Sequence, residues 1–202
     1  VFTRMTYMVT GGAGFIGSHL VDALIQQNCD VVIVDDFSLG NRHNIVQRKK
    51  KENVIVVKKS VCDDLSKLFK QHPIDVIFHL AAIPNVQFSI DYPLLTHGVN
   101  VNGTLNLLNL SRKFNVKRFI FASSASVYGD SNTVPFVEDM LPRPMSPYAL
   151  QKLIGEHYGK LFTELYGVQT TSLRYFNVFG PRQNPERNYG FLFRVVGELN
   201  VR

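Results

Sequence analysis

The feature that most constrains the fold is a regular alternation between short apolar segments and longer segments with helical periodicity. Six segments have the length and β-branched content of strands: residues 6–9, 31–34, 54–57, 76–80, 119–122 and 170–176. Five segments have helical patterns: residues 14–27, 65–71, 94–114, 147–166 and 189–199. Strands that alternate with helices form parallel sheets with both faces covered. The sequence therefore predicts an α/β fold with a doubly wound parallel sheet.

Composition excludes several classes of function. The chain has 202 residues, of which 45% are hydrophobic, so it can bury a sizeable core. Its net charge of +6 lies partly in the basic run at residues 48–51, which is typical of a solvated surface and is accompanied by no nucleic-acid-binding motif. The two cysteines, Cys29 and Cys62, form no metal-ligand or disulfide pattern, which favours a cytoplasmic location. Apolar runs are far shorter than the ~20 residues of a membrane span, so we expect no nucleic-acid, membrane or metal partner.

A glycine-rich turn follows the first predicted strand. Gly11, Gly14 and Gly17 have the spacing of a dinucleotide-binding fingerprint and lead into the predicted helix 14–27. Glycine allows the tight turn and the close approach of a pyrophosphate to the positive end of a helix. Glycine-rich turns that bind no ligand also exist, but the order of strand, turn and helix favours a cofactor.

An aspartate follows the second predicted strand. Asp35 is placed where a carboxylate can accept hydrogen bonds from both hydroxyls of an adenosine ribose. Its charge would repel the 2′-phosphate of NADP, so the sequence predicts NAD. Arg42 in the next loop could compensate for that repulsion, which leaves NADP as the alternative.

Tyr148 and Lys152 are four residues apart in the predicted helix 147–166, so both lie on one helix face. Ser146 has the character of an N-cap and Pro147 that of the first helical residue, which places Tyr148 in the first turn. There the helix dipole and the lysine ammonium both favour phenolate, and we predict that Tyr148 is a general base. The alternative is a tyrosine and a lysine that merely pack as surface neighbours.

A serine-rich turn at residues 123–129 follows the fifth predicted strand. Ligands of parallel α/β sheets bind at the carboxyl ends of the strands, so a hydroxyl here could hold the substrate oxygen that Tyr148 deprotonates. Serine clusters after strands are also common turn chemistry, and this alternative stays open.

Six motifs together resemble the extended short-chain dehydrogenase/reductase family over nearly the whole chain. They are TGGAGFIG at 10–17, HLAA at 79–82, NVNGT at 100–104, SSASVYG at 123–129, SPYALQK at 146–152 and RYFNVFGPRQNP at 174–185. Within that family the chain is most similar to NAD-dependent 4-epimerases of UDP-glucose and UDP-N-acetylglucosamine. Related dehydratases have an Asp-Glu pair in the serine turn and UDP-glucuronate decarboxylases a glutamate. Ala125 and Ser126 stand there in this chain, which disfavours both reactions.

The resemblance implies a Rossmann-like domain and inversion at C4 of a UDP-hexose. Tyr148 would remove the proton of the sugar 4-hydroxyl, Ser124 would hold that oxygen, and Lys152 would bind the nicotinamide ribose and tune the tyrosine. Hydride would move to NAD, and the 4-keto sugar would rotate and take the hydride back on its other face. The alternatives are an NAD-dependent nucleotide-sugar reductase or dehydratase, and an NAD-binding module without turnover.

The resemblance also implies the contacts of both ligands. The NAD site would comprise Gly11, Gly14, Phe15, Ile16, Gly17, Asp35, Asp36, Phe37, Ser38, Gly40, Ser60, Val61, Leu80, Ala81, Ala82, Asn100, Tyr148, Lys152 and Phe176. The sugar-nucleotide site would comprise Ser124, Ser126 and Asn177. His79 is expected to support its strand rather than take part in the chemistry.

Two positions depart from the family pattern. Many relatives bind adenine through an acid after the third strand, where this chain has Ser60, whose hydroxyl can still bond the adenine amine. Some UDP-galactose epimerases have a lysine where this chain has Pro84, which favours the N-acetyl type of substrate.

Chains of the family continue into a small C-terminal lobe that covers the nucleotide sugar. The resemblance therefore predicts an NAD-binding domain at residues 1–180 and the start of the substrate lobe at 181–202, with most of that lobe absent through truncation. It also implies a homodimer that pairs through the predicted helices 94–114 and 147–166.

Overall fold

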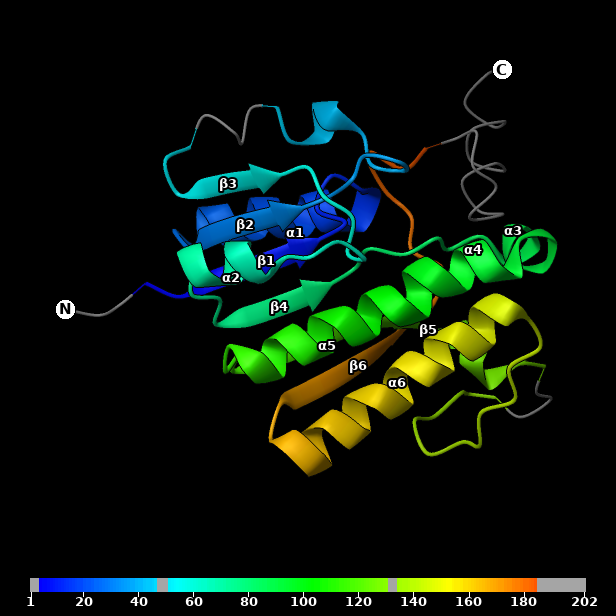
Figure 1. Cartoon of the computed structure of the whole chain (residues 1–202). Helices are drawn as coiled ribbons and strands as arrows, with labels where there is room; N and C mark the ends of the chain where they lie inside the picture. The colour runs from blue at the N-terminus through cyan, green and yellow to red at the C-terminus, as the bar shows by residue number, and fades with distance from the viewer. Residues whose placement is uncertain (1–3, 47–50, 131–133, 185–202) are drawn as a thin grey trace, which may run out of the picture.

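A sheet of six parallel strands forms the centre of the molecule (Figure 1). The structure is a computed structural model and describes residues 4–46, 51–130 and 134–184. The strands are β1 (Thr6–Thr10), β2 (Asp30–Val34), β3 (Val54–Val57), β4 (Val76–His79), β5 (Arg118–Ser124) and β6 (Gln169–Tyr175). Their order in the sheet is β3-β2-β1-β4-β5-β6. This is the order of the doubly wound nucleotide-binding fold, so the predicted fold class is confirmed.

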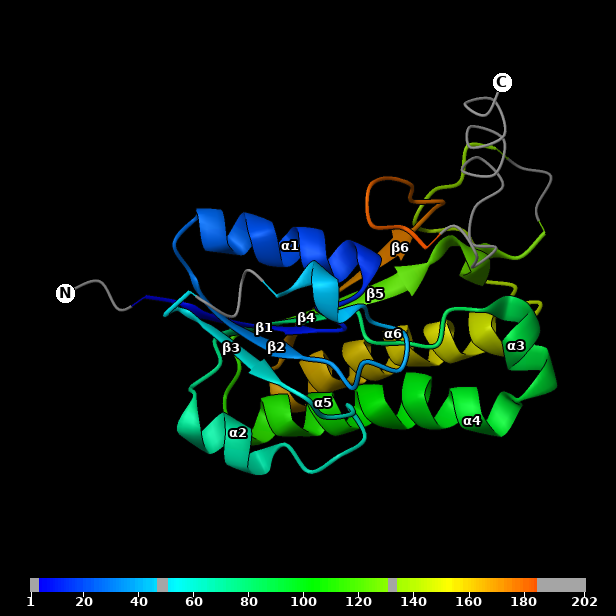
Figure 2. The ribbon, with the colours of Figure 1, turned by 90° about the horizontal axis from the view of Figure 1, so that it is seen from above.

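Helices lie on both faces of the sheet (Figure 2). Helix α1 (Phe15–Gln26) lies on one face, and α2 (Ser66–Gln71), α5 (Gly103–Lys113) and α6 (Pro147–Tyr166) lie on the other. The short helices α3 (Val86–Asp91) and α4 (Pro93–His97) precede α5. Two 3₁₀ turns, η1 (Arg42–Asn44) and η4 (Ala125–Tyr128), follow β2 and β5.

The helix predicted at residues 94–114 is interrupted in the structure. Helix α4 leads into a π-helical segment, η3 (Gly98–Asn102), which leads into α5. The π-helical turn carries Asn100, whose Oδ1 accepts a hydrogen bond from the backbone N–H of Ile83 at 2.8 Å. Such turns are frequent at functional sites because they redirect a side chain without ending the helix. The helix predicted at residues 189–199 lies outside the described residues.

Alternate strand residues pack into two apolar layers. Met8 and Ile77 pack against the layer that contains α5 and α6, whereas Val9 and Ile33 pack with Val21 of α1. All five side chains have no exposed surface. Each such side chain contributes roughly 1.5–3 kcal/mol by leaving water. The strands therefore form a rigid frame for the loops that follow their carboxyl ends.

Candidate active site

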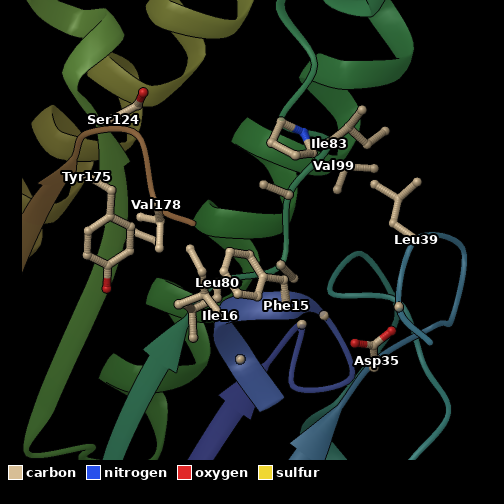
Figure 3. A pocket seen from close by; sticks show the side chains of 18 of the residues that line it. Phe15, Ile16, Asp35, Leu39, Leu80, Ile83, Val99, Ser124, Tyr175 and Val178 are labelled. Carbon is tan, nitrogen blue, oxygen red and sulfur yellow. The ribbon is translucent and has the colours of Figure 1, made fainter. Parts of the chain in front are cut away.

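A cavity of about 1120 Å³ opens at the carboxyl ends of the strands. It lies where β1 is flanked by both β2 and β4, which is the ligand-binding point of doubly wound sheets. Figure 3 shows Ile16 and Leu80 at its floor, with Asp35 on one side and Ser124 on another. Small-molecule pockets usually measure about 300–1,000 Å³, so this cavity has room for a dinucleotide together with part of a second ligand.

The glycine turn brings the backbone of α1 to the cavity. Gly11 has a φ of +68°, and a Cβ there would lie 2.8 Å from the backbone N of Ala81. A Cβ at Gly17 would overlap the carbonyl oxygen of Gly11. Gly14 is the N-cap of α1 and provides no side-chain hydrogen bond, and the first turn contains no acidic residue. Backbone N–H groups at the positive end of this 12-residue helix therefore fit the pyrophosphate of a dinucleotide.

Asp35 directly follows β2 at the side of the cavity (Figure 3). Its Oδ2 accepts a hydrogen bond from the N–H of Ala13 and its Oδ1 one from the N–H of Phe37, each at 2.9 Å. Burial raises the pKa of Asp35, and the two backbone donors oppose that rise. A Cβ at Gly40 would lie 2.6 Å from Oδ1, so the glycine leaves room beside the carboxylate. Each carboxylate oxygen retains a lone pair for a ribose hydroxyl.

The cavity brings together most residues predicted to contact NAD. These are Gly11, Gly14, Phe15, Ile16, Gly17, Asp35, Asp36, Ser38, Gly40, Ser60, Val61, Leu80, Ala81, Ala82, Tyr148, Lys152 and Phe176. Phe37 and Asn100 lie behind the wall instead. The Phe37 ring stacks under the guanidinium of Arg42, whose Cζ is 4.3 Å from the ring centroid. Asn100 is 2% exposed, and its side-chain amide forms hydrogen bonds with the backbone of Ile83 and with the side chain of Gln151.

Helix α6 carries Tyr148 and Lys152 on the face toward the cavity. Ser146 caps the helix, because its Oγ accepts a hydrogen bond from the N–H of Ala149 at 3.1 Å, and Pro147 is the first helical residue, as predicted. The Nζ of Lys152 lies 5.8 Å from the centroid of the Tyr148 ring and donates to the carbonyl oxygen of Ala122 at 2.8 Å. Burial lowers the pKa of Lys152 to about 8, so the ammonium form still predominates at neutral pH.

Ser124 ends β5 and faces the same cavity. Its Oγ accepts hydrogen bonds from the N–H of Ser126 at 3.2 Å and from the Oγ of Ser126 at 2.9 Å. A hydroxyl that accepts two bonds keeps its own proton for donation. Ser124 can therefore donate to an oxygen of a ligand in the cavity. Ser126 and Asn177, the other predicted sugar contacts, line the same space.

His79 lies beneath the cavity rather than in it. The ring is 1% exposed, with Nδ1 2.7 Å from Thr10 Oγ1 and Nε2 2.9 Å from Thr104 Oγ1. Thr104 Oγ1 donates to the carbonyl oxygen of Asn100, so it accepts from the imidazole Nε2–H. Burial, aided by the charge of Lys152, lowers the pKa of His79 to about 3. A neutral imidazole that joins two strands and a helix fits the predicted structural role.

Comparison with known proteins identifies the family. Residues 7–201 match the model of the NAD dependent epimerase/dehydratase family. The chain belongs to this family. The resemblance to extended short-chain dehydrogenases/reductases that the motifs indicated is thereby confirmed.

Several members of the family are similar in sequence and structure. A putative UDP-glucose 4-epimerase of Methanocaldococcus jannaschii is 42% identical over 95% of this chain and 62% of its own. The solved UDP-glucose 4-epimerase of Thermotoga maritima, with UDP-glucose, has a TM-score of 0.86 at 39% identity over 92% of this chain and 60% of its own. The UDP-N-acetylglucosamine 4-epimerase of Methanobrevibacter ruminantium has a TM-score of 0.90 at 39% identity over 98% of this chain and 64% of its own. The chain thus spans less than two thirds of the length of these family members.

Part of the cavity wall of this family member gave no signal in the sequence. Leu39, Ile83 and Val99 line the cavity, but isolated apolar residues in loops and helices have no chemical signature (Figure 3). Tyr175 and Val178 also line it and lie inside the motif RYFNVFGPRQNP, where only Phe176 and Asn177 were singled out.

In the part of the chain that the structure describes, no group of three or more His, Cys, Asp or Glu side chains could hold a metal ion. Among the same residues, no helix combines the length and the apolar character that a bilayer-spanning segment needs.

Proposed function

We propose that the protein is an NAD-dependent nucleotide-sugar 4-epimerase that acts on UDP-hexoses, either UDP-glucose and UDP-galactose or their N-acetyl forms. The observation that carries the proposal is that Tyr148, Lys152 and Ser124 face one cavity whose glycine floor fits a dinucleotide pyrophosphate. The activities for which the similar proteins are named support the choice of reaction and of substrate class.

Each of the three residues has a separate task in this reaction. Tyr148 takes the proton from the sugar 4-hydroxyl and returns a proton to the same oxygen. Lys152 keeps a positive charge next to the tyrosine, which favours the phenolate, and binds the nicotinamide ribose. Ser124 donates its proton to the sugar oxygen and so holds that oxygen against Tyr148. When NAD is bound, its nicotinamide supplies a reversible acceptor of hydride.

The cofactor-binding part of the proposal rests on the walls of the cavity. The first turn of α1 would hold the pyrophosphate, Asp35 the adenosine ribose, and Ser60 the adenine. Phe176 and residues 80–82 would line the nicotinamide end. We propose that residues 1–180 form the NAD-binding domain and that residues 181–202 begin the substrate lobe.

We also propose a homodimer. The outward surface of α3, α4 and α6 exposes a group of large apolar side chains: Ile90, Leu94, Leu95, Leu150 and Leu161. These three helices contact one another, and exposed apolar side chains on neighbouring elements favour an interface. Sedimentation of the protein with and without Leu94→Glu tests the dimer, because a buried charge should separate the subunits.

Both cysteines are free thiols, which supports a cytoplasmic location as part of the same proposal.

Product analysis of the full gene product tests the reaction. The protein is incubated with NAD and, separately, with UDP-galactose, UDP-N-acetylgalactosamine and their gluco epimers, while NMR follows the anomeric protons. Interconversion within one pair establishes the activity and identifies the substrate. A dehydrated or net reduced product, or no product while NAD is bound, would refute the proposal.

A matched pair of variants assigns the base. Tyr148→Phe should lower the rate by about 10²–10⁴-fold, which is the usual contribution of a general base, and leave NAD binding intact. Tyr158→Phe removes a hydroxyl from the same helix, where the ring packs against the core, and should turn over at nearly the unmutated rate. Equal rates for the two variants would exclude Tyr148 as the base.

A further inference from the structure

In the first turn of α6, the backbone N–H groups donate hydrogen bonds to two different residues, Ser146 and Ser89. Pro147 has no N–H, and Ser146 accepts from Ala149 through Oγ and from Leu150 through its carbonyl oxygen. The remaining donor is the N–H of Tyr148 itself, and it donates to the Oγ of Ser89 at 3.0 Å. Ser89 belongs to α3, so the residue proposed as the base is tied by its own backbone to a neighbouring helix.

Burial and two hydrogen bonds hold the Ser89 side chain in this contact. Its side chain has no exposed surface, and its Oγ donates to the carbonyl oxygen of Val86 at 2.6 Å. The hydroxyl therefore donates one bond and accepts another in a fixed direction. Val86 lines the cavity next to the loop that contains Ile83 and Pro84, so Ser89 joins the cavity wall to Tyr148.

One turn further along α6, Gln151 makes a second connection of the same kind. Its Oε1 accepts from Asn100 Nδ2 at 2.8 Å, and its Nε2 donates to Thr96 Oγ1 at 2.9 Å. Gln151 is 3% exposed and precedes Lys152. Asn100 in turn bonds both backbone groups of Ile83 in the cavity wall. The helix turn that carries Lys152 is thus fixed to the same wall.

We propose that Ser89 and Gln151 are positioning residues that hold Tyr148 and Lys152 at fixed places against the cavity wall at residues 80–86. The proposal rests on the proposed function, because the groups being positioned are its base and its cation. Ser124 lines the cavity, whereas Ser89 and Gln151 do not. Their effect is therefore on the positions of Tyr148 and Lys152. A displacement of about 1 Å at a reacting group is sufficient to lower a rate by about 10²-fold.

The serines of the chain provide controls that separate positioning from folding. Ser89→Ala removes the contact with Tyr148. Ser111→Ala removes an equally buried serine hydroxyl that donates to Leu107 within α5, away from the cavity. Ser146→Ala removes the other cap of the same first turn, the bond to Ala149. Gln151→Met keeps the length of the side chain while removing its hydrogen bonds to Asn100, Thr96 and the carbonyl oxygen of Pro93.

The experiment combines amide hydrogen exchange without substrate, NAD titration, and epimerase kinetics on the full gene product. In Ser89→Ala we expect faster exchange at Tyr148, a kcat lower by about 10²-fold, and a Kd for NAD and a KM within about twofold of the unmutated values. Gln151→Met should lower kcat by about 10-fold with the same unchanged Kd. Ser111→Ala and Ser146→Ala should keep kcat within about threefold.

The outcomes separate this inference from the function on which it rests. A kcat of Ser89→Ala equal to that of Ser111→Ala, or exchange at Tyr148 that does not change, overturns the positioning role. An equal loss of kcat in Ser146→Ala also overturns it, because any weakening of the helix start would then suffice. If the unmutated protein epimerises no UDP-hexose, the proposed function is wrong, and exchange at Tyr148, which needs no substrate, still decides whether Ser89 fixes that residue.

Discussion

At the scale of single residues, His79 makes the stability of the fold depend on pH. Its pKa is lowered from 6.5 to about 3 in the folded chain, because charging it would place a cation among buried groups beside Lys152. As the pH falls below 6.5, the unfolded chain takes up a proton that the folded chain does not accept until about pH 3. Stability is therefore complete above pH 6.5 and is lost as the pH falls, by about 1.4 kcal/mol per pH unit from this residue.

Unfolding by denaturant between pH 5 and pH 7, at about half-unit steps, measures this dependence. His79→Gln keeps a side-chain donor and acceptor but removes the titration. We expect the slope of the free energy of unfolding against pH to fall by about 1.4 kcal/mol per unit in the variant. Parallel slopes for the two proteins would show that His79 carries no such effect.

We expect Asp35 to set the choice between NAD and NADP. Asp35 is 6% exposed, and its carboxylate is fixed in place by hydrogen bonds from the N–H groups of Ala13 and Phe37. A 2′-phosphate beside it would therefore be repelled by a negative charge. Asp35→Asn removes the charge and keeps one oxygen acceptor. The ratio of the Kd for NADP to that for NAD should fall by about 10-fold in equilibrium titrations. A ratio that stays the same would mean that Arg42 or another group sets the preference.

At the scale of the elements, an ion pair joins α6 to the outer strands of the sheet. Arg174 of β6 contacts both carboxylate oxygens of Glu156 of α6, and the Oγ of Ser123 of β5 donates to the same carboxylate at 2.5 Å. The side chains of the pair are 17% and 12% exposed, and hydrogen bonding to Glu156 raises the pKa of Arg174. Such a pair is costly to break because one charge is left in a poorly solvated place.

Glu156→Gln should therefore lower the free energy of unfolding by about 2 kcal/mol. This is less than the roughly 3–5 kcal/mol lost when one partner of a fully buried pair is removed. The double variant Glu156→Gln with Arg174→Met should lose less than the two single losses added together, because no charge is then left unpaired. Glu164→Gln breaks the exposed pair with Lys160 on the same helix and should cost about 0.5 kcal/mol or less. Denaturant unfolding of the unmutated protein, Glu156→Gln, Arg174→Met and the double variant measures the coupling, and strictly additive losses would contradict it.

The elements that the sequence predicted are those fixed by their own pattern. Strands β1 to β5 contain short apolar runs and the edge strand β6 contains threonine and aromatic residues typical of strands, so β1 to β6 were predicted to within two residues at each end. Helix α6 has a cap and a first-turn proline in its sequence, and its bounds were predicted without error. Helix α3 was missed because six residues do not establish a helical period. The π-helical turn was missed because it depends on Asn100 reaching Ile83, a contact between elements.

The residues of the site likewise separate into those that the local sequence indicates and those that depend on contacts between elements. Gly11, Asp35, Tyr148 and Lys152 could be proposed from the sequence because their chemistry and their order along the chain indicate a function, and the structure places all four at one cavity. Ser89 could not, because its proposed role depends on a hydrogen bond to a residue in a helix that is distant in the sequence. Sequence motifs therefore indicate candidate ligand-binding groups, whereas the contacts that hold such groups in place are visible only once the chain is folded.

At the scale of the whole molecule, the segment after β6 returns across the sheet to α1. Residues 176–178 and 182–184 line the cavity, and the carbonyl oxygen of Pro181 lies 2.9 Å from His19 Nε2. Arg182 pairs with Asp22 at 2.5 Å and donates to Ser18 Oγ at 3.1 Å. Helix α1 provides the proposed pyrophosphate site, so this segment closes one side of the cavity by attachment to the helix that would hold the cofactor.

Loosening that attachment should speed the release of NAD. Arg182→Ala removes the contacts with Asp22 and Ser18 while leaving the glycine turn and Asp35 in place, so we expect the dissociation rate of NAD to rise by about 10-fold and its association rate to change little. Stopped-flow displacement of bound NAD measures the rate. Arg4→Ala, which breaks the exposed pair with Asp30 at the opposite end of the sheet, is the matched control and should leave the rate unchanged. If the attachment is what matters, the exchanged pair Asp22→Arg with Arg182→Asp restores slow release, and if the charge of Arg182 acts on the pyrophosphate directly, release from the exchanged pair stays fast.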